Sequence, residues 1–84
     1  MSQSEKLATL IKRAEELARV NNSSEEAVRI NTMILELDDK ISGSYTRLAF
    51  CFREQGKFDL AEEMYNQVLK FDPDNMVAQN GIQD

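Results

Sequence analysis

The 84-residue chain is predicted to fold as an all-α protein in which antiparallel helical hairpins are stacked. Three observations predict this fold. Through most of the chain, apolar residues recur three or four positions apart, the spacing that places them on one stripe of a helix. The sequence contains only one proline and three glycines, so few residues oppose helix formation. The pattern of residues 42–75 also returns, in a weaker form, over residues 8–41.

The clearest hairpin is predicted over residues 42–75. Its first helix carries apolar residues at the spacing i, i+3, i+4 and i+7, which are Tyr45, Leu48, Ala49 and Phe52. Gly56 is expected to end this helix, because glycine adopts the left-handed conformation found at helix C-termini. Two helices of about 13 residues each are therefore expected on either side of Gly56.

The second helix of this hairpin ends before Pro73. Its helical period is carried by Phe58, Ala61, Met64, Tyr65, Val68, Leu69 and Phe71. Pro73 biases Asp72 out of the helical region and so marks the end of the helix. Ala49 and Ala61 fall on the facing stripes of the two helices, where larger side chains would hold the backbones apart.

These residue types at these offsets resemble the tetratricopeptide repeat (TPR), a 34-residue helix–turn–helix unit. The resemblance implies a protein-binding scaffold and not a catalyst. It implies that residues 1–84 form a single TPR domain, a short solenoid of two repeats and a truncated capping helix. Residues 8–41 would be a degenerate first repeat, residues 42–75 the second, and residues 76–84 the start of a capping or third-repeat helix.

The first repeat departs from the template in places. Its apolar offsets are filled by Ile11, Ala14, Ala18, Ala27, Ile34, Leu35 and Leu37. The run Ser23-Ser24-Glu25-Glu26 is predicted to be a capping box that opens the second helix. Three offsets differ from the second repeat, with Glu15 for Ala49, Asn31 for Tyr65 and Asp39 for Pro73. Terminal repeats are often atypical because one side faces water.

A further helix is predicted from Met76 onward, capped by Asp74 or Asn75. It covers about two turns before the sequence stops, which is short for the solvating helix that closes such arrays. Two interpretations stay open at this stage: a shortened array, or one that continues in a longer protein.

Composition excludes several other classes. No apolar run approaches the roughly 18 residues that span a membrane. The N-terminus lacks the pattern of a secretory signal, so a cytoplasmic location is the default expectation. The single cysteine, Cys51, cannot form an internal disulfide, and its place beside Phe52 predicts an inert thiol in the core.

No enzyme is expected. The chain has no histidine and one cysteine, so the usual general base and a nucleophilic dyad are both missing. A zinc site wants four nitrogen or sulfur ligands, and Asp72-x-Asp74-Asn75 lacks the glycine and distal glutamate of a calcium loop. Adjacent acidic residues elsewhere are expected on solvated helix faces. We therefore predict no metal and no cofactor.

The charges are divided unevenly between the predicted helices. Residues 4–20 and 43–55, the first helices of the two hairpins, hold six basic and four acidic side chains, whereas the rest of the chain holds four basic and eleven acidic ones. The resemblance places the first helix of each hairpin on the concave surface. A basic inner surface is therefore expected on a protein whose net charge is −5.

Six residues on the expected concave surface are candidates for binding a partner: Lys12, Arg13, Arg19, Arg47, Phe50 and Arg53. Arginine's planar group of donors suits the capture of a carboxylate or a phosphate, although a solvated helix face is the alternative for all five cations. Phe50 either anchors an apolar side chain of the partner or packs beneath the third helix. Both interpretations stay open.

The family's carboxylate clamp, which grips the acidic tail of a chaperone, is not expected here. Lys12 occupies the position of one clamp lysine. The other four clamp positions hold Glu16, Arg47, Val77 and Gly81, none of which agrees with the clamp. A different acidic or extended peptide is the expected partner.

Other partners are less compatible with the sequence. The net charge of −5 opposes nucleic-acid binding and also binding to anionic membranes. The alternative to peptide binding is a structural element that self-associates or caps a larger protein. This alternative supposes that Leu7, Leu10 and Leu17 at one end, or Met64, Val68 and Phe71 at the other, lack cover.

Overall fold

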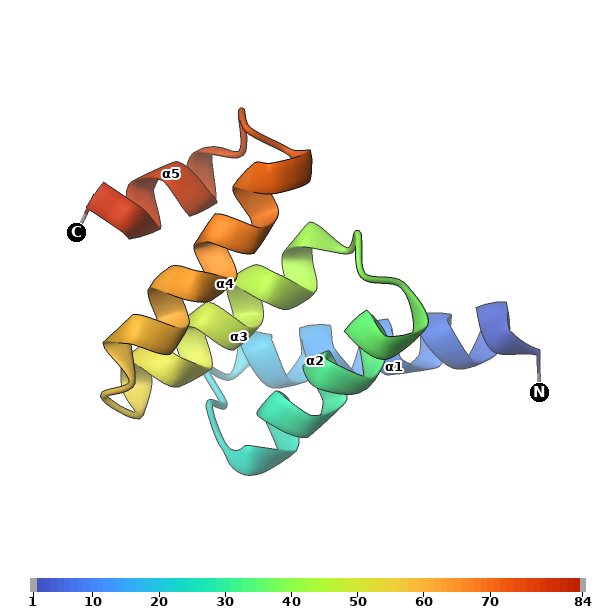
Figure 1. Ribbon diagram of the computed structural model, residues 1–84. Helices are drawn as coiled ribbons and strands as arrows, with labels where there is room; N and C mark the ends of the chain where they lie inside the picture. Colours follow the sequence, from blue (N-terminus) through green and yellow to red (C-terminus); the bar gives the residue numbers. More distant parts are fainter. Residues whose placement is uncertain (1, 84) are drawn as a thin grey trace.

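The computed structural model describes the backbone of residues 2–83 and the side chains of residues 2–82. Within these residues the chain forms five α-helices and no strand, which confirms the all-α prediction. The helices are α1 (Gln3–Arg19), α2 (Glu25–Leu37), α3 (Ser42–Glu54), α4 (Phe58–Phe71) and α5 (Met76–Gln83). Consecutive helices pack on one another as antiparallel hairpins, so the molecule is a short solenoid with its termini at opposite ends (Figure 1).

The hairpin of α3 and α4 has the geometry predicted from the sequence. The two helices have 13 and 14 residues. Gly56 between them has a φ of 78°, the left-handed conformation that glycine adopts without a steric penalty. Ala49 and Ala61 are 0% and 4% exposed and belong to one core cluster, so the two backbones meet through small side chains. Asp72 lies outside the helical region, as expected for the residue before Pro73.

Helix α5 closes this hairpin. Asn75 caps the helix, because its Oδ1 accepts a hydrogen bond from the N–H of Ala78 at 3.0 Å. Ala78 is fully buried in the same cluster as Val68 and Tyr65. Gly81 lies directly over the ring of Tyr65, and a Cβ at this position would overlap that ring.

The expectation that the stripe of Met64, Val68 and Phe71 lacks cover is wrong. Val68 is 0% exposed beneath α5, whose eight residues suffice to cover it. Phe71 is covered from another side, with its ring centroid 6.0 Å from that of Tyr45 and 5.5 Å from Nζ of Lys40. The second repeat is therefore closed at its C-terminal end within the residues described.

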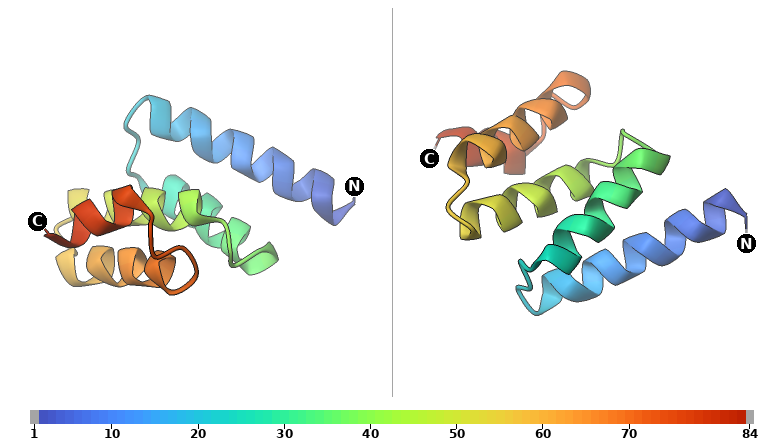
Figure 2. Two further views of the ribbon diagram at one scale, coloured as in Figure 1. Left: turned by 90° about the horizontal axis from the view of Figure 1, so that it is seen from above. Right: turned by 60° about the horizontal axis from the view of Figure 1, so that its bottom comes forward.

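The hairpin of α1 and α2 is packed through only half of α1. Ala14 and Leu17 of α1 are buried, as are Ala27 and Ile34 of α2. The N-terminal half of α1 projects beyond the other helices in both views of Figure 2. Leu17 belongs to the packed half of α1 and is buried, whereas the sequence pattern allowed for it to lack cover.

The predicted capping box at the start of α2 is wrong. Ser24 is the N-cap, and its side chain makes no capping hydrogen bond. The backbone N–H of Ser24 instead donates a hydrogen bond to Oδ1 of Asn22 at 2.9 Å. Glu26, which would complete the box, turns toward α1 and forms an ion pair with Arg13 at 3.0 Å. The carboxylate is engaged across the hairpin and therefore does not reach back to the cap.

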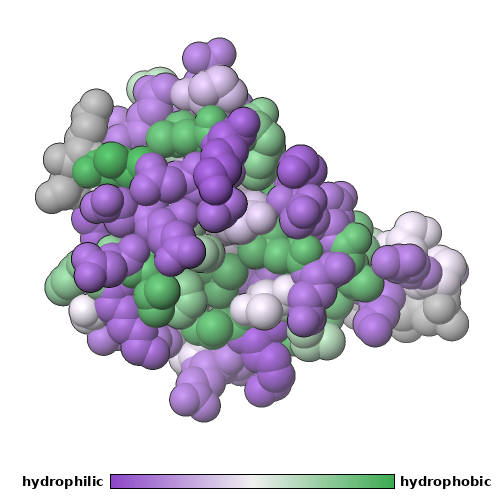
Figure 3. Space-filling model, viewed as in Figure 1, coloured by the Kyte–Doolittle hydropathy of each residue, from purple (hydrophilic) through white to green (hydrophobic). Residues whose placement is uncertain are grey.

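The surface is mixed in polarity. On the face shown in Figure 3, polar side chains divide the apolar surface into separate patches. None of the helices in the described part of the chain combines the length and the apolar character needed to cross a membrane.

Candidate protein-binding groove

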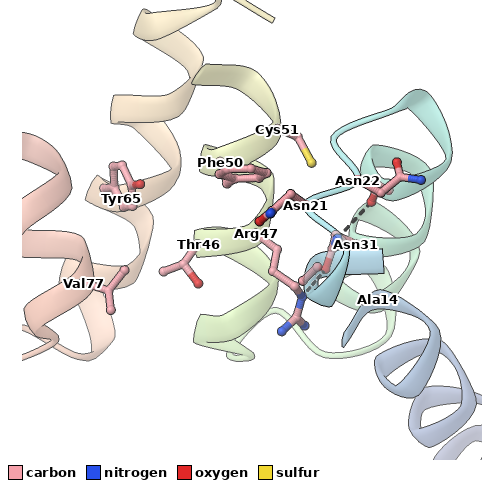
Figure 4. A pocket seen from close by; sticks show the side chains of 12 residues that line it. Ala14, Asn21, Asn22, Asn31, Thr46, Arg47, Phe50, Cys51, Tyr65 and Val77 are labelled. Carbon is pink, nitrogen blue, oxygen red and sulfur yellow. Dashed lines mark hydrogen bonds between the residues drawn. The ribbon is translucent and has the colours of Figure 1, made fainter. Parts of the chain in front are cut away.

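A groove with a volume of about 320 Å³ lies between the first hairpin and α5, with α3 along its floor. Alanine and asparagine side chains from α1, α2 and the turn between them line one side of the groove: Ala14, Ala18, Asn21, Asn22, Ala27 and Asn31. Thr46, Arg47, Phe50 and Cys51 of α3 form the floor, and Tyr65 and Val77 close the far side. Figure 4 shows Asn31 on one side of α3, and Tyr65 and Val77 on the other.

Arg47 is held in place by two polar neighbours. Its Nε donates a hydrogen bond to Oδ1 of Asn31 at 2.9 Å, shown dashed in Figure 4, and its Nη2 donates to Oγ of Ser44 at 3.2 Å. Asn31 is 1% exposed, and its Nδ2 donates to the carbonyl of Ala27 at 2.9 Å. Both ends of the Asn31 amide are therefore satisfied, and its orientation fixes that of the guanidinium.

The charge of Arg47 is half-buried and has no ion pair within the part of the chain that the structure describes. Burial lowers the pKa of the guanidinium, and the nearby carboxylate of Glu15 raises it to a smaller extent. Among residues 2–82, no carboxylate lies close enough to Arg47 to form a salt bridge. Arginine stays protonated under such conditions, so the groove contains a positive charge.

Phe50 lies in the groove and not in the packed interior. It belongs to neither of the two core clusters that the structure describes. Its neighbour in the lining, Val77 of α5, is 58% exposed. An aromatic ring and an exposed valine together give the groove an apolar section of its own.

Cys51 lies beneath the groove, with Leu17 and Ala27 around it. It is 2% exposed, which confirms that the thiol is buried. Burial raises the pKa of this thiol, so the neutral form is favoured. The residue therefore packs as a small apolar side chain.

The remaining predicted binding residues do not line this groove. Arg13 is paired with Glu26 on the side of α1 that faces α2. Arg53 lines a separate hollow together with Phe58 and Gly81. Lys12 and Arg19 are exposed on α1 and are not part of the groove lining.

The lining of this groove carries little of the charge of the helices that form it. One cation, Arg47, lines the groove, and α1 contributes Ala14 and Ala18 in place of charged residues. The offsets of the second repeat could not be transferred to α1, since Arg13 is drawn toward α2 by Glu26.

Sequence reasoning missed Asn31 as a site residue. The sequence did mark Asn31 as unusual, because it stands at the offset where residues 42–75 have the aromatic Tyr65. A polar residue at an offset that is otherwise apolar must find partners if it is buried. Arg47 and the carbonyl of Ala27 are those partners.

Among the described residues, no group of three or more histidine, cysteine or acidic side chains could hold a metal ion.

Comparison with known proteins adds one match. Residues 43–75 match the family model described as the tetratricopeptide repeat. No curated protein and no solved structure matches the chain. The chain thus contains a tetratricopeptide repeat, formed by α3, α4 and the turn after them. Such repeats are generally non-enzymatic scaffolds for protein–protein interaction, and this is the class of function that the fold and the match support.

Proposed function

We propose that the groove over α3 binds an extended segment of a partner protein. The observation that carries this proposal is an open groove on a protein-binding fold, with an aromatic side chain that is not part of the core. An apolar side chain of the partner would lie against Phe50 and Val77. Aromatic anchors in such positions commonly supply most of the binding energy of an interface.

The rim and floor of the groove suit an extended backbone. Asn21 and Asn22 lie at the turn between α1 and α2. The oxygen of an asparagine side chain can accept a hydrogen bond from a peptide's N–H, and its NH2 group can donate one to a peptide's C=O. Ala14 and Ala18 leave room beside them. A segment lying along α3 would therefore meet hydrogen-bonding groups at one side and apolar groups on the floor.

We further propose that residues 8–41 are a divergent repeat of the same kind as residues 42–75. Asn31 contacts Arg47 in the helix that follows its own, through a hydrogen bond. Tyr65 likewise contacts a residue of the next helix, Gly81, through its ring. Both pairs are separated by the same distance in the sequence. Residues 1–84 would then form a single domain, with α5 as its capping helix.

Of the six predicted binding residues, we assign direct contact to Arg47 and Phe50. Lys12 and Arg19 are exposed on α1, from which they would attract an acidic partner at longer range. Arg13 and Arg53 face other parts of the molecule.

A matched pair of phenylalanine variants tests the proposal. Peptides of 12 residues would be selected by phage display against the wild-type protein and then titrated into Phe50→Ala and Phe58→Ala. Phe58 is 64% exposed and lies outside the groove, so it is the control. We expect the selected peptides to bind Phe58→Ala as they bind wild type and to lose affinity for Phe50→Ala. Equal affinity for both variants would show that the groove is not the binding site.

Because α5 covers the C-terminal stripe, that end of the molecule no longer favours the alternative of self-association. We expect sedimentation equilibrium to give the mass of one chain from micromolar to near-millimolar concentration. A dimer that Phe50→Ala dissociates would instead mean that a second copy of the chain occupies the groove.

A further inference from the structure

The guanidinium of Arg47 is a half-buried cation that forms no salt bridge with residues 2–82, and it is the charged group in the groove lining. A charge removed from water is stabilised most by an opposite charge that also forms hydrogen bonds with it. Within the described residues, no acidic side chain supplies that partner. An anion brought by the bound segment would do so.

The neighbours of Arg47 decide which edge of the guanidinium can receive an anion. Nε is occupied by Asn31, so the side-on approach through Nε and Nη2 is blocked. Nη2 uses one of its hydrogens on Ser44, and no hydrogen bond is formed by Nη1 to any described residue. One N–H of Nη2 and both N–H bonds of Nη1, which lies beside Gly43, therefore remain for an anion that approaches the end of the group.

We propose that Asn31 and Ser44 orient Arg47 so that the groove receives one carboxylate of the partner segment end-on, beside an apolar side chain on Phe50. Asn31 is a positioning residue in this arrangement and touches no ligand itself. The inference rests on the proposed function of the groove and adds the chemistry of its ligand.

A single carboxylate suits the site better than a phosphate or a run of acidic residues. The groove lining contains one cation. A phosphate monoester carries a charge of about −1.5 to −2 and is usually held by several cations. Glu15 lies near enough to act on the charge of Arg47, so a second negative charge at the site would be repelled.

Two short probes isolate the carboxylate. The acetylated, amidated tripeptides Leu-Glu-Leu and Leu-Gln-Leu would be titrated into the ¹⁵N-labelled full chain, and the NMR signals of the Phe50 amide and the Arg47 Nε–H followed. The two peptides differ by one charge and have nearly the same shape. We expect wild type to prefer the glutamate peptide by about tenfold.

Three variants test the role of Asn31. Asn31→Ala removes the acceptor for Arg47, and Asn31→Asp keeps an acceptor but supplies a negative charge from within the protein. Both should still bind peptide and lose the preference for glutamate. Thr32→Ala, on the exposed side of the same helix, should keep it. Since Asn31→Asp keeps an acceptor for Nε of Arg47, its loss of preference would reflect neutralisation of the Arg47 charge, whereas the loss in Asn31→Ala would reflect orientation.

The outcomes separate the two proposals. If neither peptide shifts the signal of Phe50, the groove is not a peptide site, and both proposals fail. If both peptides bind wild type equally, the groove binds peptides but Arg47 does not select a carboxylate. A preference that survives in Asn31→Ala would overturn the positioning role of Asn31.

Discussion

The two junctions at which a hairpin meets the following helix solve the same packing problem in opposite ways. Between the second hairpin and α5, a large ring on α4, Tyr65, lies against a residue without a side chain, Gly81. Between the first hairpin and α3, a small amide on α2, Asn31, lies against a long side chain, Arg47. In each pair a larger side chain lies against a smaller one, although the residue types differ between the two pairs.

The two junctions contribute differently to the core and to the groove. The pair of Tyr65 and Gly81 brings α5 close to α4 and buries Val68. The pair of Asn31 and Arg47 brings a hydrogen-bonded cation to the groove lining. The polar pair thus adds a cation to the candidate groove, whereas the pair of Tyr65 and Gly81 packs α5 onto the core.

The largest effect is expected where the first helices of the hairpins differ most. Ala49 is fully buried in α3, while Glu15 at the equivalent offset of α1 is exposed. Ala49→Glu should cost about 3 kcal/mol or more of unfolding free energy, because it buries an unpaired charge. Glu15→Ala should change stability by less than about 0.5 kcal/mol. Urea denaturation would measure both, and similar costs would mean that α1 and α3 are packed alike.

A smaller cost is expected where the two hairpins agree. Ala61 and Ala27 occupy the same offset and are 4% and 2% exposed. Replacing either with leucine should overpack its helix crossing and cost about 1–3 kcal/mol. Thermal melting would measure the loss. A melting temperature unchanged in Ala61→Leu would contradict the alignment of the second hairpin with the repeat.

The size rule at the junctions can be tested by exchanging one pair for the other. Asn31→Tyr should be destabilising, because its ring would meet Arg47. Adding Arg47→Gly, which recreates the pair of Tyr65 and Gly81, should recover part of the loss, with a coupling of about 1 kcal/mol in a double-mutant cycle. If the effects of the two substitutions simply add, the pair is not a packing unit.

The smallest effect is expected at the turns inside the hairpins. Gly56 has a φ of 78° and Asn21 one of 54°, so each turn places one residue in the left-handed region. Gly56→Ala should cost about 0.5–1 kcal/mol, since the strain of alanine there exceeds the gain from a less flexible unfolded chain. Asn21→Gly should shift the denaturation midpoint by much less, because asparagine already tolerates this conformation. A stabilising Gly56→Ala would contradict the left-handed turn.

The sequence predicted what depends on local spacing. The ends of α3 and α4 and the turn at Gly56 follow from residues close together in the chain and were predicted. The cap of α5 was predicted at Asp74 or Asn75, and the structure shows that it is Asn75. Phe50 was singled out because it lies opposite the apolar stripe of its own helix. The structure places it in the groove.

Contacts between distant residues were not predictable in this way. The capping box failed because Glu26 pairs with Arg13 across the hairpin. The charge of whole helices did not predict the charge of the groove lining either, because a count by helix gives no direction to a side chain such as Arg13, which pairs with Glu26. Asn31 was noted only as a departure, because its meaning depends on Arg47, 16 residues later.

The contact of Tyr65 with Gly81 also gives the protein an optical probe of its own. The chain has no tryptophan and two tyrosines, Tyr45 and Tyr65, so these two rings supply its intrinsic fluorescence. In a Tyr45→Phe protein, all the emission would come from a ring that touches α5 and also borders the groove. Detachment of the last helix and arrival of a ligand could then be followed by light, without any attached label.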